Sequence, residues 1–257
     1  VWRTAWGLPG GLDDSAEPTS YRFALGGIVA GLAYMTAFWS QAGGAWSAML
    51  LYFLLYYALF SAVTKMRAEI GPPTHELGQM ATTRMIVELL GSRGLSKGTL
   101  VSYALLWFNN RMVRSHQMPV QLEGLKMAEK AGIGYRGLGI AMLAAVLAGL
   151  LSGYWALLSD AYGSKGARGT GFAAETFSQL QAWLVNPQGP SALPVAFMGA
   201  GAVFALLLGA ARRRFIGWPF HPAGFALGMV FGLDYVWMPI LIAWAAKALV
   251  LRYGGLW

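Results

Sequence analysis

Residues 137–158 read GLGIAMLAAVLAGLLSGYWALL, an apolar run without a charged side chain. A helix needs about 20 such residues to cross the hydrocarbon core of a bilayer. Three further stretches approach that length without an internal charge, at residues 23–39, 46–64 and 193–211. The sequence therefore predicts an all-α, polytopic integral membrane protein with about four full spans.

The composition of the chain favours the same class. The chain has 257 residues, of which 56% are hydrophobic and 12% are charged. This charged fraction is about half of that in soluble globular domains, which excludes a soluble enzyme. We attribute the net charge of +8 to cytoplasmic loops rich in Lys and Arg, and we expect no nucleic-acid partner. Because the chain has no cysteine, it has neither disulfides nor thiolate metal sites, and we expect no metal and no cofactor.

We interpret residues 1–257 as one integral membrane domain, whose first partner is the lipid bilayer. The chain begins at Val1 without a preceding Met and ends abruptly at Trp257. We therefore expect it to be part of a longer polypeptide.

Residues 65–136 are the most polar part of the chain, with ten basic and five acidic side chains. Within this segment, residues 100–108 are apolar but reach only about half the length of a span, which favours a short re-entrant or buried helix. If that helix does not cross, all ten basic residues lie on one side of the membrane. Residues 212–214, three consecutive arginines, return to that side after two more spans. The excess of Lys and Arg predicts that this side is cytoplasmic.

The opposite side is expected to carry a turn at residues 41–45 and an extracytoplasmic loop at residues 159–192. Between residues 172 and 184 of this loop, apolar side chains recur at helical spacing with polar side chains between them. This pattern predicts an amphipathic helix that lies on the membrane surface.

The last apolar region, residues 216–251, is too long for one span and short for two spans with a turn. It is interrupted by Pro219, Pro222 and Pro239 and by several glycines. Such breaks persist at membrane depth only where protein or water surrounds the freed backbone groups. We predict a broken helix or a helical hairpin, a form that builds substrate and ion sites in transporters.

The first candidate site follows the second predicted span and contains Glu69, His75 and Glu76. The Gly-Pro-Pro sequence at residues 71–73 stops a helix and restricts the following backbone. The three titratable side chains could line a polar cavity, relay protons or hold a cation. In the alternative interpretation, Glu69 solvates a helix end and the Gly-Pro-Pro sequence is only a turn.

The second candidate site, directly after the short apolar helix, contains Asn109, Asn110, Arg111, Arg114 and His116. At the mouth of a re-entrant helix, the guanidinium groups could bind a carboxylate or a phosphate. Alternatively, the arginines reach lipid headgroups and the asparagines cap the helix end.

The third candidate is Asp234, the acid within the final apolar region. A carboxylate buried at membrane depth would indicate proton or cation coupling, whereas at the tip of a hairpin it would lie at the interface. We interpret His221 as structural, since no second ligand follows at the spacing of a known metal site. The aromatic run at residues 52–60 covers more than one helix face, which favours packing over cofactor binding.

Several strings resemble one known family: RAEIGPPTHEL at residues 67–77, WFNNR at 107–111, RSHQMP at 114–119 and WPFHPAG at 218–224. The family consists of uncharacterised bacterial and archaeal polytopic membrane proteins of unknown function, distantly grouped with oligopeptide-transporter-like proteins. The resemblance spans nearly the whole chain. It implies the carboxy-terminal portion of a longer protein in a prokaryotic cytoplasmic membrane, and it supplies no substrate and no catalytic residue.

Two functions agree with these observations, and neither is enzymatic. The first is a carrier driven by protons or cations, with an unknown small solute bound among the candidate residues. The second is a non-catalytic scaffold or accessory subunit, in a homo-oligomer or a larger membrane complex. In that case glycine faces and aromatic surfaces serve helix and lipid packing.

Overall fold

The computed structural model describes residues 2–7, 9, 13–14, 17–71, 82–111, 116–163, 170–228 and 231–254. These residues form helices, turns and connections and contain no strand, which confirms the all-α prediction. The helices are, in chain order, α1 Trp2–Ala5, α2 Tyr21–Gln41, α3 Trp46–Ile70, α4 Thr82–Leu90, η1 Ser92–Gly94, α5 Lys97–Leu105, α6 Trp107–Arg111, α7 Gln117–Ala131, α8 Tyr135–Gly163, α9 Thr170–Val185, α10 Ala192–Arg214, α11 Pro222–Leu227, α12 Phe231–Asp234 and α13 Trp237–Tyr253.

Four of these helices are long and apolar enough to cross a membrane, namely Tyr21–Gln41, Trp46–Ile70, Gly137–Gly163 and Ala192–Arg214. Each contains one of the four predicted spans, so the positions of the long apolar helices are confirmed. At 1.5 Å per residue, even the 21-residue helix is about 31 Å long, close to the thickness of a bilayer's hydrocarbon core. These helices indicate a membrane protein.

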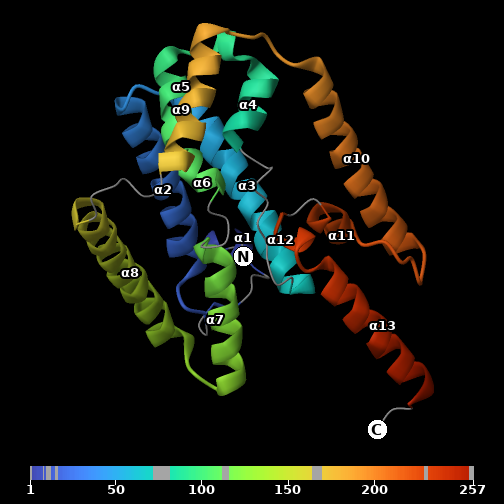
Figure 1. Ribbon diagram of the computed structural model, residues 1–257. Coiled ribbons are helices and arrows are strands. Elements are labelled where there is room, and N and C mark those ends of the chain that lie inside the picture. The colour runs from blue at the N-terminus through green and yellow to red at the C-terminus, as the bar shows by residue number, and fades with distance from the viewer. Residues whose placement is uncertain are drawn as a thin grey trace.

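Helix α3 is the centre of the packed part of the molecule (Figure 1). It contacts α2, α4 and α7. Its inward side chains Met49, Tyr52 and Phe53 have no exposed surface. They belong to one core cluster with Ile86 of α4 and Tyr103 of α5. Because lipid tails are as apolar as these side chains, close packing rather than escape from water holds such a core together in a membrane.

The short apolar segment forms a helical hairpin in which α4 runs toward one end of α3 and α5 returns from it (Figure 1). Leu100, Tyr103 and Ala104 of α5 are buried, whereas the predicted segment at residues 100–108 is divided between α5 and α6. The Ser96 hydroxyl accepts a hydrogen bond from the Thr99 amide and caps α5. Together, α4, η1 and α5 are called the short hairpin below.

The tip of the short hairpin is tied to two connections of the longer helices. The Ala45 amide donates to the Thr99 hydroxyl at 2.9 Å, and the Gln188 amide donates to the Ser92 hydroxyl at 2.9 Å. Gly98 lies so close to the Gly43 carbonyl that a Cβ atom at this position would overlap it. The tip, the turn at residues 42–45 and the connection at residues 186–191 therefore lie at the same end of the molecule.

This arrangement corrects one part of the predicted topology. Arg93 and Lys97 flank the tip and lie with the turn at residues 42–45, whereas the sequence placed all ten basic residues of segment 65–136 at the opposite end. The physical reason is that protein surrounds the hairpin. Neighbouring chain supplies partners for its backbone and caps, so a pair of half-length helices can enter and return without the length of a span.

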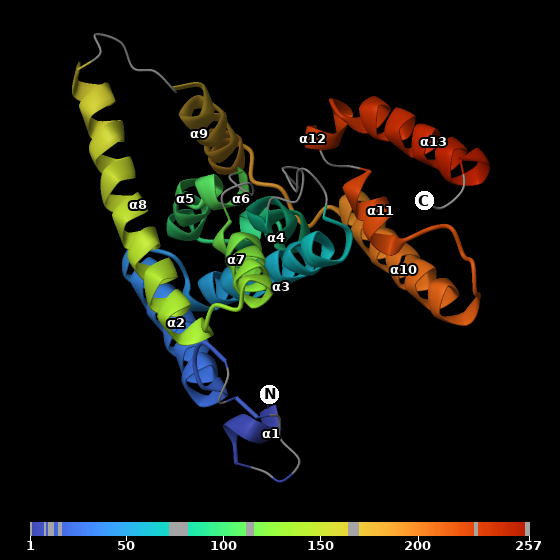
Figure 2. The same ribbon diagram turned by 90° about the horizontal axis from the view of Figure 1, so that it is seen from below.

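Helix α9 corresponds to the predicted amphipathic helix, but part of its apolar face is covered by protein. It packs against α5 and η1, Leu180 is buried, and Trp183 contacts the core cluster. Phe177 and Leu184 remain exposed. The short hairpin thus lies between α9 and the rest of the packed part (Figure 2).

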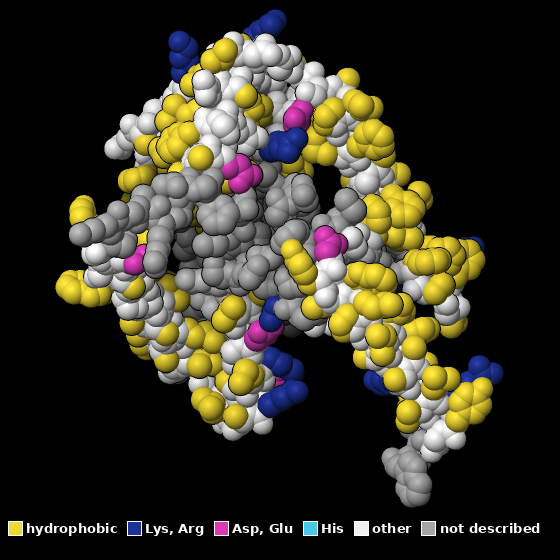
Figure 3. Space-filling view, viewed as in Figure 1, with side chains coloured by type: hydrophobic (Ala, Val, Ile, Leu, Met, Phe, Trp, Pro, Cys, Tyr) yellow, Lys and Arg dark blue, Asp and Glu magenta, His cyan; other side chains and the backbone are white. Residues whose placement is uncertain are grey.

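The carboxy-terminal region is a broken helical unit, as predicted. After α10, Gly217 adopts a φ of +86°, and the chain continues through the short helices α11 and α12 into α13. Leu227 is buried and Leu233 contacts the core cluster, but no residue of α13 is buried against the described part of the chain. Helices α10 and α13 diverge from the packed part and expose apolar side chains (Figures 2 and 3).

Candidate functional site

Polar and aromatic side chains meet where α3 passes the junction between α6 and α7. Tyr52, Tyr56 and Phe60 recur every four residues and share one face of α3. Their rings stack along the helix, with centroids 5.8 Å apart for Tyr52 and Tyr56 and 4.3 Å apart for Tyr56 and Phe60. The imidazole of His116 stacks on Phe60 at 3.9 Å with an interplanar angle of 17°. Tyr52, Tyr56, Asn109 and His116 are called the interior polar cluster below.

His116 begins α7. Its Nδ1 atom accepts a hydrogen bond from the Met118 amide at 3.3 Å, so the imidazole acts as the amino-terminal cap of this helix. Phe60, on which His116 stacks, lies about 21 Å along an α3 helix of about 37 Å. The beginning of α7 therefore lies near the middle of α3 rather than at its ends.

The Tyr52 hydroxyl lacks a hydrogen-bond partner among the residues that the structure describes, although Tyr52 has no exposed surface. The Asn109 side chain lies beside this hydroxyl, outside hydrogen-bonding geometry. Tyr103, packed against Tyr52, instead donates from its hydroxyl to the Ala48 carbonyl at 2.9 Å. Burying a polar group without a partner lowers stability by roughly 1–3 kcal/mol. The Tyr52 hydroxyl is therefore available to donate a hydrogen bond to a group bound in the interior.

A second buried hydroxyl of this kind lies on α5. The Ser102 Oγ atom is buried and has no partner within the described part of the chain. Ser102 is adjacent in sequence to Tyr103, on the helix that covers α3. Two buried hydroxyls without partners in one helical layer indicate a polar interior rather than a purely apolar core.

The structure brings together only some of the residues predicted from the sequence. Asn109 and His116 belong to the interior polar cluster. Asn110 and Arg111 lie in α6, but their side chains are outside the described residues, as are His75, Glu76 and Arg114 entirely. Asp234 ends α12 with an exposed side chain.

Glu69 lies at the end of α3, apart from the interior polar cluster. Its carboxylate is 3.8 Å from Lys65 Nζ and 3.9 Å from His221 Nε2. His221 also caps α11, because its Nδ1 atom accepts from the Ala223 amide at 3.0 Å. This structural role agrees with the interpretation of His221 from the sequence, and the contact with Glu69 adds a link between α3 and the carboxy-terminal region.

Sequence reasoning missed Tyr52, which it assigned to packing with the rest of the aromatic run. One signal was present, since Tyr rather than Phe occupies three positions of that run and each phenol needs a partner when buried. The pattern could not show which hydroxyl lacks a partner, because that depends on the approach of α5 and α6.

Together these features define a helical protein of membrane type with polar groups buried between short, discontinuous helices. The chain belongs to a family of unknown function, DUF6785, whose sequence profile matches residues 1–257. Neither the curated proteins nor the solved structures contain a match to it. The resemblance to a family of unknown function is thus confirmed. The grouping with oligopeptide-transporter-like proteins and the prokaryotic membrane remain predictions.

Proposed function

We propose that the protein is a membrane carrier for a small polar solute that binds at the interior polar cluster. The observation that carries this proposal is the Tyr52 hydroxyl, which is buried on a long apolar helix without a partner in the described part of the chain. If this position only packed against its neighbours, Phe would serve equally well, because Phe has no hydroxyl to remove from water. A solute with a hydrogen-bond acceptor would satisfy the hydroxyl when bound.

The short helices around the cluster support the proposal. Transporters commonly place their substrate between discontinuous helices near the bilayer midplane, because the helix ends expose unpaired backbone groups to the ligand. Here α7 begins beside α3, and α5 of the short hairpin has residues buried in the packed part. Protein encloses this irregular backbone, which is the condition for its presence at membrane depth.

His116 is our proposed proton-coupling group. A histidine changes its charge between about pH 5 and 8, and His116 lies in the interior polar cluster against Phe60. Protonation would alter both its stacking and its ability to cap α7, so it would couple the proton to the position of α7. Cation coupling through Glu69 or Asp234 receives less support, because both carboxylates lie at exposed positions outside the cluster.

A scaffold is the second candidate function, and exposed apolar helices favour it. Within the described part of the chain, no residue in the most apolar window of α8 is buried, and none in α13 is buried. Such faces contact either lipid or other protein subunits. A scaffold does not require the buried Tyr52 hydroxyl, which is why we rank it second.

The test is substrate-induced current in proteoliposomes that contain the purified chain, measured with a proton gradient and a panel of amino acids, short peptides, sugars and carboxylates. For any active solute, Tyr52→Phe is expected to reduce apparent affinity about tenfold, the equivalent of one hydrogen bond. Tyr103→Phe is the matched control and should retain affinity, since its hydroxyl is already satisfied by Ala48. Absence of current with the whole panel, together with stable co-purification of other membrane subunits, would favour the scaffold.

A further inference from the structure

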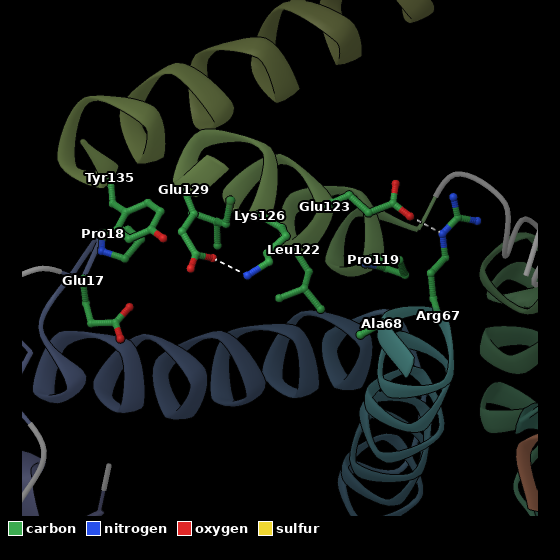
Figure 4. Close-up of a pocket in the computed structure, with 11 residues that line it drawn as sticks. Glu17, Pro18, Arg67, Ala68, Pro119, Leu122, Glu123, Lys126, Glu129 and Tyr135 are labelled. Atoms are coloured by element: carbon green, nitrogen blue, oxygen red, sulfur yellow. Dashed lines mark hydrogen bonds and ion pairs between the residues drawn. The ribbon is translucent and has the colours of Figure 1, made fainter. Parts of the chain in front are cut away.

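A pocket at the end of α3 is separate from the interior polar cluster. It lies about 10 Å beyond Phe60 along α3 and has a volume of about 490 Å³. This is within the roughly 300–1,000 Å³ of small-molecule sites. The segment before α2, the end of α3, one face of α7 and the first residue of α8 form its walls (Figure 4).

Positively and negatively charged side chains line this pocket. Arg67 Nε contacts Glu123 Oε1 at 2.5 Å, and Lys126 Nζ contacts Glu129 Oε2 at 2.6 Å. The fifth charged group, Glu17, accepts a hydrogen bond from the Tyr21 hydroxyl and has no cationic partner in the described part of the chain. One negative charge of the lining is therefore not neutralised.

The hydrogen bond to Glu129 and the charge of that carboxylate raise the pKa of Lys126. Lys126 keeps its positive charge throughout the neutral range, and an ammonium group has three N–H donors, so Lys126 can contact an anionic group beside Glu129. Figure 4 shows Glu17 and Tyr135 at one end of the pocket, the Arg67–Glu123 pair at the other, and the Lys126–Glu129 pair between them.

The remaining lining is apolar and aromatic. Pro119 and Leu122 of α7 and Ala68 of α3 cover one side, and the ring of Tyr135 lies near Glu17 (Figure 4). A carboxylate next to an aromatic ring is a favourable environment for an organic ammonium group. A ligand that fits this lining carries a positive group, a negative group and an apolar part.

We propose that this pocket binds a phosphoethanolamine group, with its ammonium at Glu17 and Tyr135 and its phosphate near Lys126. This inference goes beyond the proposed carrier function and does not depend on it. The pocket lies where α2 and α8 begin and α3 ends. If these helices cross a bilayer, their ends lie at headgroup depth, where phosphatidylethanolamine presents this group and its acyl chains extend along the apolar helices.

The test uses the full purified chain and a short-chain phosphatidylethanolamine, with binding measured by native mass spectrometry and by the shift of the thermal midpoint. Phosphatidylglycerol, which lacks the ammonium, and free phosphoethanolamine, which lacks the acyl chains, are the comparison ligands. Glu17→Gln removes the charge but retains an acceptor for Tyr21. Glu175→Gln on α9 is the control, because it makes the same change on an exposed side chain outside the pocket.

We expect Glu17→Gln to weaken phosphatidylethanolamine binding about tenfold, and Glu175→Gln to leave it unchanged. Binding of both phosphatidylethanolamine and free phosphoethanolamine, each weakened by Glu17→Gln, would assign the site to the headgroup alone. Binding of the lipid without the free headgroup would assign it to the membrane lipid. Equal binding of phosphatidylglycerol and phosphatidylethanolamine, or no effect of Glu17→Gln in a variant with the thermal midpoint of the wild type, would overturn the proposal.

Discussion

Helices α3 and α8 are similar in length and apolar composition, yet they differ in their surroundings. In the most apolar window of α3, 39% of residues are buried, whereas in that of α8 none is buried. Helix α3 carries the buried aromatic face and the interior polar cluster, while α8 exposes Leu143, Leu151 and Trp155. Hydropathy alone therefore does not distinguish a helix that organises a protein interior from one that faces its surroundings.

The largest expected effect comes from a pair of glycine substitutions, one at the tip of the short hairpin and one in α8. Gly98→Ala places a methyl group against the Gly43 carbonyl, a backbone group that cannot rotate away, and is expected to destabilise the protein by about 3 kcal/mol. Gly149→Ala in α8 meets no atom within 4 Å and should leave stability unchanged or slightly improved. Thermal unfolding in detergent measures both. Equal midpoints for the two variants would contradict the close contact at the tip.

Truncation of core and exposed side chains is expected to have the next largest effect. Met49→Ala removes a side chain with no exposed surface and should cost about 2–3 kcal/mol. Leu151→Ala removes a side chain that is 74% exposed and should cost less than about 0.5 kcal/mol in the isolated chain. A large loss for Leu151→Ala would show that α8 is covered by another copy or another subunit in the purified particle.

Substitution of Tyr103 and of Tyr52 tests which buried hydroxyl has a hydrogen-bond partner. Tyr103→Phe removes a satisfied hydrogen bond to Ala48 and is expected to destabilise the protein by about 1 kcal/mol. Tyr52→Phe removes a hydroxyl without a partner in the described part of the chain, and should leave stability unchanged or raise it. Chemical unfolding curves of the two variants give the comparison. Destabilisation by Tyr52→Phe would mean that its hydroxyl is already satisfied, which would remove the main support for a solute site.

The smallest expected effect concerns the link between α3 and the carboxy-terminal region. His221→Asn retains an acceptor that can cap α11 but removes the contact with Glu69. Because the Glu69 side chain is solvent-exposed, the coupling should be below about 1 kcal/mol in a double-mutant cycle with Glu69→Gln. A coupling energy indistinguishable from zero would contradict the contact between the two side chains.

The sequence predicted the long helices well because their signal is local. An uninterrupted apolar run such as residues 137–158 can satisfy its backbone in a membrane only as a helix, whatever its neighbours are. The break in the last apolar region was predictable for the same reason, since Pro219 and Pro222 cannot continue a helix. The length of the apolar segment at residues 100–108 indicated that it is too short to cross a bilayer.

The candidate site was predicted only in part. Asn109 and His116 were identified because they follow a short apolar helix that was predicted to be re-entrant or buried, whereas Tyr52 was hidden within an aromatic run. The side on which Arg93 and Lys97 lie was also wrong, since counting charges assumes that every short helix stays on one side. The contact of Thr99 with Ala45, 54 residues away, decides this point and has no local signal.

By itself, the sequence determined the helical class, the four long apolar helices and the interruption of the final region, because each depends on side chains within one segment and on the need to satisfy the backbone. Only the tertiary structure decided which long helix forms the interior, where the short hairpin ends and which buried hydroxyl lacks a partner. These features depend on how closely α3, α5 and α7 approach one another, and such distances are set by packing between residues far apart in the chain.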